Sequence, residues 1–441
     1  MNHYIDQISN AIYVNSSGYR ALLLKLMISI TILLSVNVLS AQVHISAKDA
    51  IDSANKILWD KFVDKYGIIN DFVGERPTPY DCRLSRPNAF GWWTPIENGA
   101  FFTGLYLATV CERVKLTNSN VDKDKARILA QGLLKLALVS DVPGFISRGV
   151  STDGKTHYPI GSTDQTIPWF YGLFAYLKSD IPTTKEREII ENKIIEVINA
   201  VRLNDWKFPS DGMFTGRFRD NLLENRFLEV SCYLFVLKAM HEITQDKTWS
   251  NWYHMALNEK PEGSKKTRAE ICSEGILYDR EFWKERKSMN YLWIYVKNQA
   301  SLAELFKLEE NEAIKSLYAE GLNNNREFVM QSVKDYNKFD NEDNKVFGNT
   351  NWRECYPYWY PQFTKYEAIE LSRLKDEEKV GERKTYERDF MTTPLAAASI
   401  IALAKNSSDC KLIKEVISHY DYSKLYLSEF FFAKTAYYAL P

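Results

Sequence analysis

The chain has 441 residues, of which 45% are hydrophobic and 26% are charged, a composition typical of a folded globular protein. Its 56 Lys and Arg residues balance 57 Asp and Glu residues, so the sequence lacks the basic excess expected of a protein that binds nucleic acid or an anionic membrane. Aromatic residues are numerous, with 11 Trp, 26 Tyr and 23 Phe. Most must fill the core, but a flat ring also matches the apolar face of a sugar.

The N-terminal region predicts export. Arg20 and Lys25 precede an apolar run from Leu26 to Leu39, and small residues follow at Ser40 and Ala41. This pattern is typical of a secretory signal peptide, and the run is short for a membrane span. We therefore expect a signal segment over 1–41, a single domain over 42–441 and a secreted or periplasmic location, with no stable membrane span. The alternative is an uncleaved anchor.

Beyond the signal segment, apolar residues recur at three- and four-residue spacing, which is the period of the α-helix. No convincing run of alternating strand residues is present, so the predicted class is all-α. The expected helices cover 46–67, 97–115, 123–138, 164–178, 185–203, 224–244, 248–257, 290–308, 311–333, 363–374, 391–405, 409–420 and 427–440.

Short and long connections alternate along the chain, which predicts antiparallel helical hairpins. The long connections then lie together at one end, and loops of this length are uncommon unless they serve a function. The helices that follow long loops are apolar on nearly all sides, whereas their partners are amphipathic. An inner ring of buried helices within an outer ring describes an (α/α)6 toroid with long loops on one rim. The long connections cover 68–96, 139–163, 204–223, 258–289 and 334–362.

The six cysteines are scattered and form no CxxC pair, so we predict no metal site, and no cofactor motif is recognised either. Cys82, Cys272 and Cys355 fall in predicted loops. A disulfide among these three is possible in an exported protein, although the sequence cannot pair them.

Three segments carry a resemblance to a known group of proteins. They are Glu97-Asn-Gly-Ala-Phe-Phe-Thr-Gly-Leu-Tyr, Pro143-Gly-Phe-Ile-Ser-Arg-Gly and His157-Tyr-Pro-Ile-Gly-Ser-Thr-Asp-Gln. The chain resembles exported bacterial proteins of the six-hairpin glycosidase type, which include unsaturated uronyl hydrolases, in architecture and loop style. The resemblance implies glycoside hydrolysis with an Asp at the rim as general acid, and Asp164 is the position that most resembles it.

Two carboxylates are the leading catalytic candidates. Asp164 opens a predicted buried helix, and Glu97 holds the matching place on the preceding one. Glycoside hydrolysis usually needs one carboxyl to donate a proton and one to activate water or attack carbon. We expect apolar neighbours of Asp164, such as Trp169, to favour its protonated form. The alternative for both is a helix N-terminal role without chemistry.

His157 is a third catalytic candidate. With Tyr158 and Arg148 it suits a polysaccharide lyase, in which a His or Tyr removes the C5 proton and an Arg stabilises the uronate. A third possibility is a non-catalytic glycan-binding protein of a polysaccharide-uptake system. The sequence alone leaves hydrolase as the leading interpretation and these two as alternatives.

The expected partner is a carbohydrate that contains uronic acid, because several arginines fall in the long loops and can hold a carboxylate bidentately. Aromatic residues in the last long loop can stack on sugars or pack the loop onto the helices. The substrate-binding candidates are Arg148, Tyr158, Gln165, Trp92, Trp93, Arg217, Arg219, Trp352, Arg353, Tyr356 and Tyr360.

Overall fold

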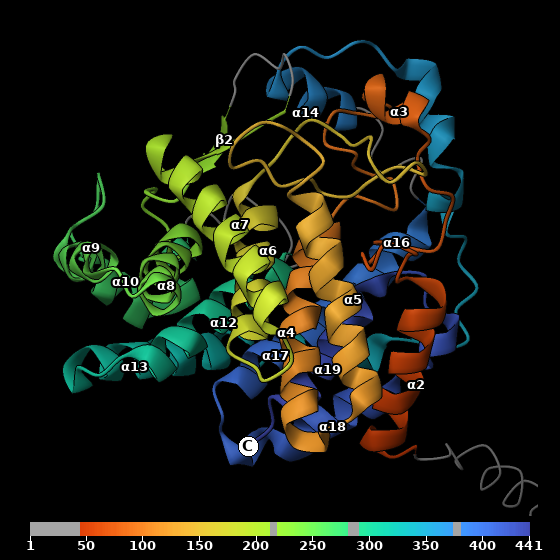
Figure 1. Ribbon diagram of the computed structural model, residues 1–441. Helices are drawn as coiled ribbons and strands as arrows, with labels where there is room; N and C mark the ends of the chain where they lie inside the picture. Colours follow the sequence, from red (N-terminus) through yellow and green to blue (C-terminus); the bar gives the residue numbers. More distant parts are fainter. Residues whose placement is uncertain (1–44, 212–217, 281–290, 374–380) are drawn as a thin grey trace, which may run out of the picture. The chain divides into compact units, whose positions relative to one another are not determined.

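The computed structural model describes residues 45–441 except 212–217, 281–290 and 374–380 (Figure 1). The chain divides into two units, Met1–Ser46 and Ala47–Pro441. The predicted signal segment and its cleavage site lie outside the described residues. Within the described residues, no helix combines the length and apolar character that are needed to cross a membrane.

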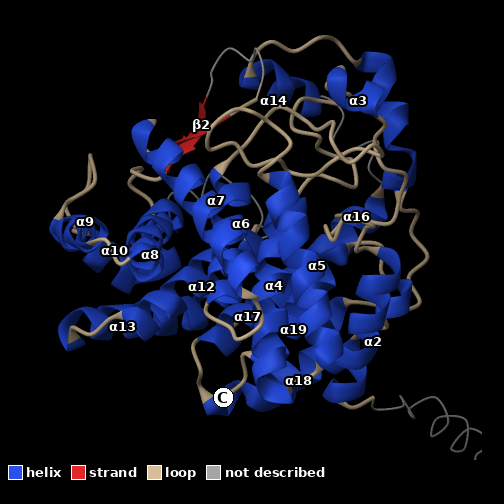
Figure 2. Ribbon diagram, viewed as in Figure 1, coloured by secondary structure: helices blue, strands red, loops and turns tan. Residues whose placement is uncertain are grey.

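The unit Ala47–Pro441 consists mainly of helices, as Figure 2 shows, and this confirms the all-α class. The connections 68–96 and 139–163 and the described part of 204–223 lie together at the end where α4 (Gly99–Thr117) and α6 (Thr163–Leu177) begin. The helices that match predicted ones are α2 (Ala47–Lys61), α4 (Gly99–Thr117), α5 (Asn120–Leu136), α6 (Thr163–Leu177), α7 (Thr184–Leu203), α8 (Phe227–Thr244), α9 (Lys247–Asn258), α12 (Leu292–Leu308), α13 (Glu312–Val329), α14 (Lys365–Arg373), α17 (Thr393–Leu403), α18 (Cys410–His419) and α19 (Phe432–Tyr438).

Several short elements lie within the predicted loops. An antiparallel pair, β1 (Lys207–Pro209) and β2 (Phe218–Asn221), occupies the third long connection, where no strand was expected. The additional helices are α3 (Pro79–Arg83), α10 (Arg268–Glu274) and α16 (Glu382–Glu387), together with the π-helix η4 (Arg388–Thr392) and the 3-10 segments η1 (Gly275–Asp279), η2 (Ser332–Lys338), η3 (Gly348–Tyr358), η5 (Ser407–Asp409), η6 (Tyr422–Lys424) and η7 (Ser428–Phe431).

Cys82 and Cys272 lie on the short helices α3 and α10, and both are buried free thiols. The disulfide that was possible between these two residues is therefore not formed. The Cys355 side chain is outside the described part of the structure. Burial in an apolar environment raises the pKa of the Cys82 thiol and that of the Cys272 thiol, so both are expected to remain protonated and unreactive.

The helices fall into buried and amphipathic sets that pack against each other. Among the buried helices, α4 packs against α6 and α19, α12 packs against α8 and α17, and α17 packs against α19. The rings of Phe170 on α6 and Phe235 on α8 lie 5.6 Å apart, which joins those two helices. The amphipathic helices pack outside them, with α5 on α4, α7 on α6, α9 on α8, α13 on α12 and α18 on α17.

Two glycines allow α4 and α6 to approach closely. A Cβ at Gly104 would lie 2.0 Å from the carbonyl oxygen of Pro168, and a Cβ at Gly172 would lie 2.4 Å from that of Gly104. Both distances are far below van der Waals contact with backbone atoms that cannot move aside. The glycines thus set the distance between α4 and α6, and with it the spacing of the groups at the start of each helix.

We expect Gly104→Ala to lower the free energy of unfolding by about 2 kcal/mol, because the added methyl forces α4 and α6 apart. Urea unfolding monitored by circular dichroism measures the change. Gly74→Ala is the control, since the nearest atoms to its Cβ would be side-chain atoms, of the Phe72 ring at 3.1 Å and of Pro95 at 3.5 Å. Equal stability of the two variants would contradict this account of the α4–α6 contact.

Candidate active site

The buried helices begin without a side-chain cap of their own. In the described structure, α4, α6, α8, α12 and α17 show no such hydrogen bond, whereas α5, α7, α9 and α13 each begin at a capping Ser, Thr, Asp or Asn. The first N–H groups of a helix need acceptors when they are buried. Carboxylates from distant loops supply them for α4 and α8. Asp71 accepts from the backbone N of Asn98 at 2.7 Å, and Asp279 accepts from that of Phe227 at 2.8 Å.

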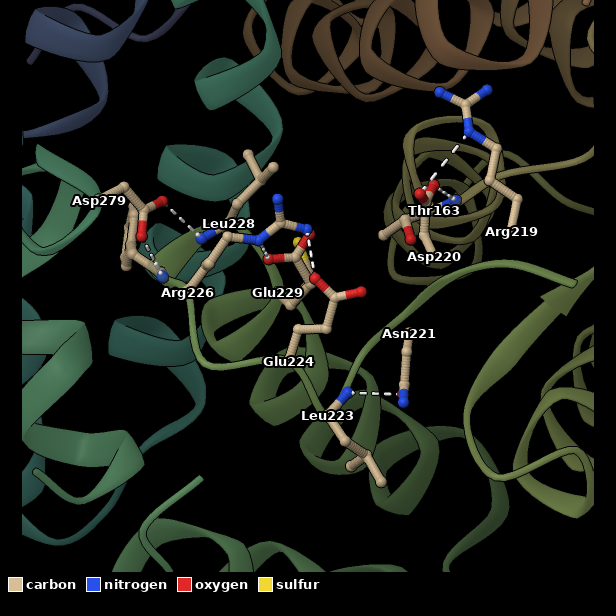
Figure 3. Close-up of polar contacts among 12 residues, drawn as sticks. Thr163, Arg219, Asp220, Asn221, Leu223, Glu224, Arg226, Leu228, Glu229 and Asp279 are labelled. Atoms are coloured by element: carbon tan, nitrogen blue, oxygen red, sulfur yellow. Dashed lines mark hydrogen bonds and ion pairs between the residues drawn. The ribbon is translucent and has the colours of Figure 1, made fainter. Parts of the chain in front are cut away.

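The start of α6 is capped in the same way by the β1–β2 pair. Oδ2 of Asp220 accepts a hydrogen bond from the backbone N of Thr163 at 3.2 Å (Figure 3). Asp220 is the extra residue of a bulge, since Phe208 pairs with Arg219 and Lys207 pairs with Asn221, and its φ of 61° places it in the left-handed region. A bulge re-aims a side chain out of the strand alternation. Asp220 therefore has the capping role that was considered for Asp164.

Arg148 joins the starts of α4 and α6. Its side chain is only 1% exposed. Its Nε donates to the carbonyl of Ile160 at 3.2 Å, and its two terminal nitrogens donate to the carbonyl of Glu97 and to Oγ of Ser162, each at 2.9 Å. Because these three acceptors already engage the guanidinium, Arg148 holds the starts of α4 and α6 together and is not exposed for binding a ligand carboxylate.

Asp164 lies beside this buried cation on the first turn of α6. Its side chain is 21% exposed, and its Oδ1 lies 3.7 Å from the Arg148 guanidinium. Within the described residues, Oδ1 is buried and receives no hydrogen bond. Burial alone would raise the pKa of Asp164, but Arg148 and Arg219 outweigh that effect, so its pKa lies below the usual value. Asp164 is thus a carboxylate at neutral pH.

This charge state corrects the expectation of a protonated Asp164. Trp169 does not form an apolar wall beside the carboxylate, because its ring is fully buried and its indole N–H donates to the carbonyl of Leu133 on α5 at 2.8 Å. The nearby cations determine the charge of Asp164. The geometry suits a base or nucleophile better than a general acid.

Tyr158 and Gln165, predicted to bind substrate, have structural contacts instead. Tyr158 is 1% exposed, and its hydroxyl donates to the carbonyl of Arg86. Gln165 is fully buried, donates to Oδ1 of Asn98 at 3.1 Å and accepts from the backbone N of Phe101 at 3.2 Å. The contacts of both residues are with other parts of the protein, so their role is structural.

An aromatic pair lies beside Arg219, one of the two arginines that lower the pKa of Asp164. Trp92 is half-buried and stacks on Phe90 with ring centroids 4.4 Å apart. The Arg219 guanidinium lies 4.6 Å from the centre of the Phe90 ring and 6.0 Å from that of Trp92. One terminal nitrogen of Arg219 has no hydrogen-bond partner among the described residues. Arg219 and Trp92 are therefore the predicted binding residues that are best placed for a ligand, and sequence reasoning missed Phe90.

Trp93 and Glu97 form a local contact before α4. The Trp93 ring is 5% exposed, and its backbone N donates to the Glu97 carboxylate at 3.1 Å. This contact explains why Trp93 does not line the site as predicted. Glu97 is half-buried, and its backbone carbonyl accepts from Arg148, the same arginine whose guanidinium lies 3.7 Å from the Asp164 carboxylate.

Glu97 belongs to a group of three carboxyls with Asp71 and Glu429, neither of which the sequence singled out. Burial, followed by the charges of Glu97 and Glu429, raises the pKa of Asp71 well above its usual value. Burial is also the main reason that the pKa of Glu429 rises to about 7. Glu429 is 1% exposed, and its Oε2 receives no hydrogen bond from the described residues. The pKa values of Asp71 and Glu429 are thus raised, whereas that of Asp164 is lowered.

We expect Glu429→Gln to stabilise the fold at alkaline pH by about 3 kcal/mol. The raised pKa of Glu429 means that the wild type is most stable below the unfolded pKa of a Glu and loses stability as the pH rises toward about 7. Gln has no charge to bury, so it avoids that loss. Denaturant unfolding at pH 4 and pH 8 measures it. A stability difference that does not change between the two pH values would contradict the prediction.

His157 does not have a nitrogen available for proton abstraction. Its Nδ1 lies 2.9 Å from the carbonyl oxygen of Lys155, and its Nε2 lies 2.7 Å from Oδ2 of Asp211. Both ring nitrogens thus face acceptors and are engaged in loop contacts. This arrangement gives no support to a lyase base at His157.

The candidates in the last long loop have contacts within the loops. Trp352 is 2% exposed and donates to the carbonyl of Glu75 at 2.9 Å, and Arg353 pairs with Glu75 at 2.5 Å and Asp81 at 3.3 Å. The Tyr360 hydroxyl donates to the carbonyl of Glu367 at 3.4 Å. These contacts agree with packing of the loop rather than with sugar binding. Arg217 and the Tyr356 side chain lie outside the described part of the chain.

A second charged group occupies the starts of α8 and α12. Arg226 binds both oxygens of Glu229 at 2.9 and 2.7 Å and also pairs with Glu224, as Figure 3 shows. Lys297 on α12 is 2% exposed and donates to the side chain of Asn298 at 3.0 Å. After the two arginines and a hydrogen bond from Ser162, the charge of Lys297 also lowers the pKa of Asp164. The charge of Lys297 therefore acts on the same site as Arg148 and Arg219.

A separate cavity of about 440 Å³ lies among the carboxyl-terminal halves of the buried helices. Alanines and other apolar side chains line most of it. The carboxylates at its edge are engaged, Glu112 with Lys115 and Glu304 with Lys307, each at 2.6 Å. This chemistry gives no reason to place a hydrolytic site there.

Within the described ranges, no group of three or more His, Cys, Asp or Glu side chains is arranged to hold a metal ion. No family model, curated protein or solved structure matches this chain.

Proposed function

We propose that this protein is a glycoside hydrolase that cleaves an acidic saccharide at the group formed by Asp164, Arg148, Arg219 and Trp92. The observation that carries the proposal is the state of Asp164. It is an ionised carboxylate with an oxygen that has no described hydrogen-bond donor, and Asp220 already caps its helix. A partly exposed carboxylate that lies beside a buried cation and keeps one oxygen without a hydrogen-bond donor among the described residues is a candidate for chemistry.

In this proposal Asp164 activates water or attacks the anomeric carbon. The proton for the leaving group comes from one of the three neighbouring carboxyls, Asp71, Glu97 and Glu429. Asp71 and Glu429 are buried, whereas Glu97 is half-buried. The raised pKa values of Asp71 and Glu429 and the lowered pKa of Asp164 support these roles, because hydrolysis needs one ionised and one protonated carboxyl. Trp92 provides a stacking surface, and the N–H of Arg219 suits a sugar carboxylate.

The architecture proposed for this function is an (α/α)6 toroid of the six-hairpin glycosidase type, in an exported protein. Support comes from the order of helix contacts, in which α4, α6, α8, α12, α17 and α19 each pack against the next and α19 returns to α4. The starts of α4, α6 and α8 all receive loop carboxylates. This order of contacts suits an inner ring with its site at one rim.

A screen of acidic oligosaccharides and polysaccharides tests the proposed function. We expect new reducing ends without the absorbance of an unsaturated product. Reducing ends that appear together with that absorbance would replace hydrolysis with lyase chemistry. Binding of a saccharide without any turnover would instead establish a glycan-binding protein.

A further inference from the structure

Three aromatic side chains project into solvent from the segments above the proposed site. Tyr80 on α3 is 55% exposed, Phe363 before α14 is 65% exposed, and Tyr366 on α14 is 73% exposed. Figure 1 shows α3 and α14 beyond the long loops, at the same end of the unit. We call these three residues the aromatic ridge. Exposed apolar side chains that gather in one patch mark interaction surfaces, whereas single ones are ordinary.

The ridge is connected to the proposed site through buried contacts. Ala368 and Ile369 of α14 pack in one cluster with Phe90 and Trp92. Oε1 of Gln362 accepts a hydrogen bond from the backbone N of Ala89 at 3.0 Å. The inner face of α14 thus covers the aromatic pair beside Arg219, while Tyr366 on the same helix faces outward.

Arginine stacking holds the two segments of the ridge together. The Arg86 guanidinium lies 5.5 Å from the centre of the Tyr80 ring and 4.5 Å from that of Trp359. The Trp359 indole donates to the carbonyl of Ser85 at 3.2 Å. α3 and the segment that leads into α14 therefore form one surface with a fixed geometry.

We propose that the aromatic ridge binds additional sugar units of an acidic polysaccharide whose cleaved bond lies at Asp164. This inference rests on the proposed function and specifies its substrate as a polymer rather than a disaccharide. Planar rings suit the apolar faces of successive sugars. Arg83 is exposed on α3, and Lys365 lies 5.4 Å from the ring centre of Tyr366, so the rings are accompanied by cations that complement a polyanion.

The test compares binding of the polymer with turnover of a small substrate. The variant carries Tyr366→Ala and Phe363→Ala, and Leu116→Ala is the matched control because that residue is 71% exposed at the opposite end of α4. We expect the double variant to lose about tenfold in affinity for an acidic polysaccharide, measured by affinity electrophoresis. Turnover of the corresponding disaccharide should equal that of the wild type, and the control should change neither value.

Unchanged polymer affinity in the double variant would overturn the ridge, whether or not the protein is a hydrolase. An equal loss for polymer and disaccharide would also overturn it, because the residues would then belong to the cleavage site itself. The binding measurement does not depend on turnover, so failure of the hydrolase proposal can be distinguished from failure of the ridge proposal. In that case the wild type would cleave no saccharide, while the double variant would still bind the polymer more weakly than the control does.

Discussion

Asp164→Asn is expected to reduce turnover by roughly a hundred- to ten-thousand-fold while the fold and saccharide binding remain close to those of the wild type. The amide has nearly the same size but cannot accept a proton or act as a nucleophile. Initial rates on the saccharide found by the screen, together with calorimetric binding, measure the two effects. Retention of full activity would remove Asp164 from the proposed mechanism.

Asp220→Ala is the natural comparison for that variant. Asp220 caps α6 through the backbone N of Thr163, so its removal should lower the free energy of unfolding by about 1 kcal/mol. Asp164 makes no such bond, and its substitution should affect turnover far more than stability. If the two variants behaved alike, the distinction between the capping carboxylate and the reactive one would be wrong.

The pH dependence of the free energy of unfolding tests independently whether Asp164 is ionised in the folded protein. Its pKa in the folded protein is below the ordinary value, so the ionised group stabilises the fold above the unfolded pKa. That contribution is lost as the pH falls through the folded pKa. Denaturant unfolding should therefore show a difference between wild type and Asp164→Asn that is largest near neutral pH and diminishes on acidification.

The helices could be predicted because apolar periodicity over ten or more residues is a strong signal. The buried character of α4, α6 and α17 follows from sequences that are apolar on all sides. Short elements such as α3 are only a turn or so long, which leaves no period to detect. The β1–β2 pair was missed for the same reason, since each strand has at most four residues.

The position of the site could be predicted more readily than its chemistry. Asp164 and Glu97 were expected at the starts of neighbouring buried helices, and the structure brings both to Arg148. The charge of Asp164 could not be predicted, because it depends on how closely the fold brings Arg148 and then Arg219 to the carboxylate. Asp71 and Glu429 were missed because neither lies in a recognisable motif, and only the fold places them beside Glu97.

The aromatic run near residue 352 shows a different limit. Sugar stacking and loop packing both require a group of large aromatic side chains, so a sequence looks the same in either case. The structure buries Trp352 and engages Arg353 with two carboxylates. Such rings are distinguished only by what they contact, which composition does not report.

Arg148→Met is expected to lower the free energy of unfolding by about 3 to 5 kcal/mol, the largest effect on stability that we predict. Met fills a similar volume but donates no hydrogen bond. The carbonyls of Ile160 and Glu97 and the hydroxyl of Ser162 would lose their donors in a buried place. Urea unfolding measures the loss, with Arg219→Met as the control, since Arg219 is only partly buried and should cost far less.

The same substitution should also change how the site responds to pH. Burial would raise the pKa of Asp164, and the charge of Arg148 is the largest of the effects that lower it. Without it the acidic limb of the pH–rate profile should move to higher pH. Arg148→Lys keeps the charge and loses part of the hydrogen bonding, so it should lower stability but leave the acidic limb near its wild-type position. A shift of equal size in the Lys and Met variants would show that hydrogen bonds, rather than the charge of Arg148, keep Asp164 ionised.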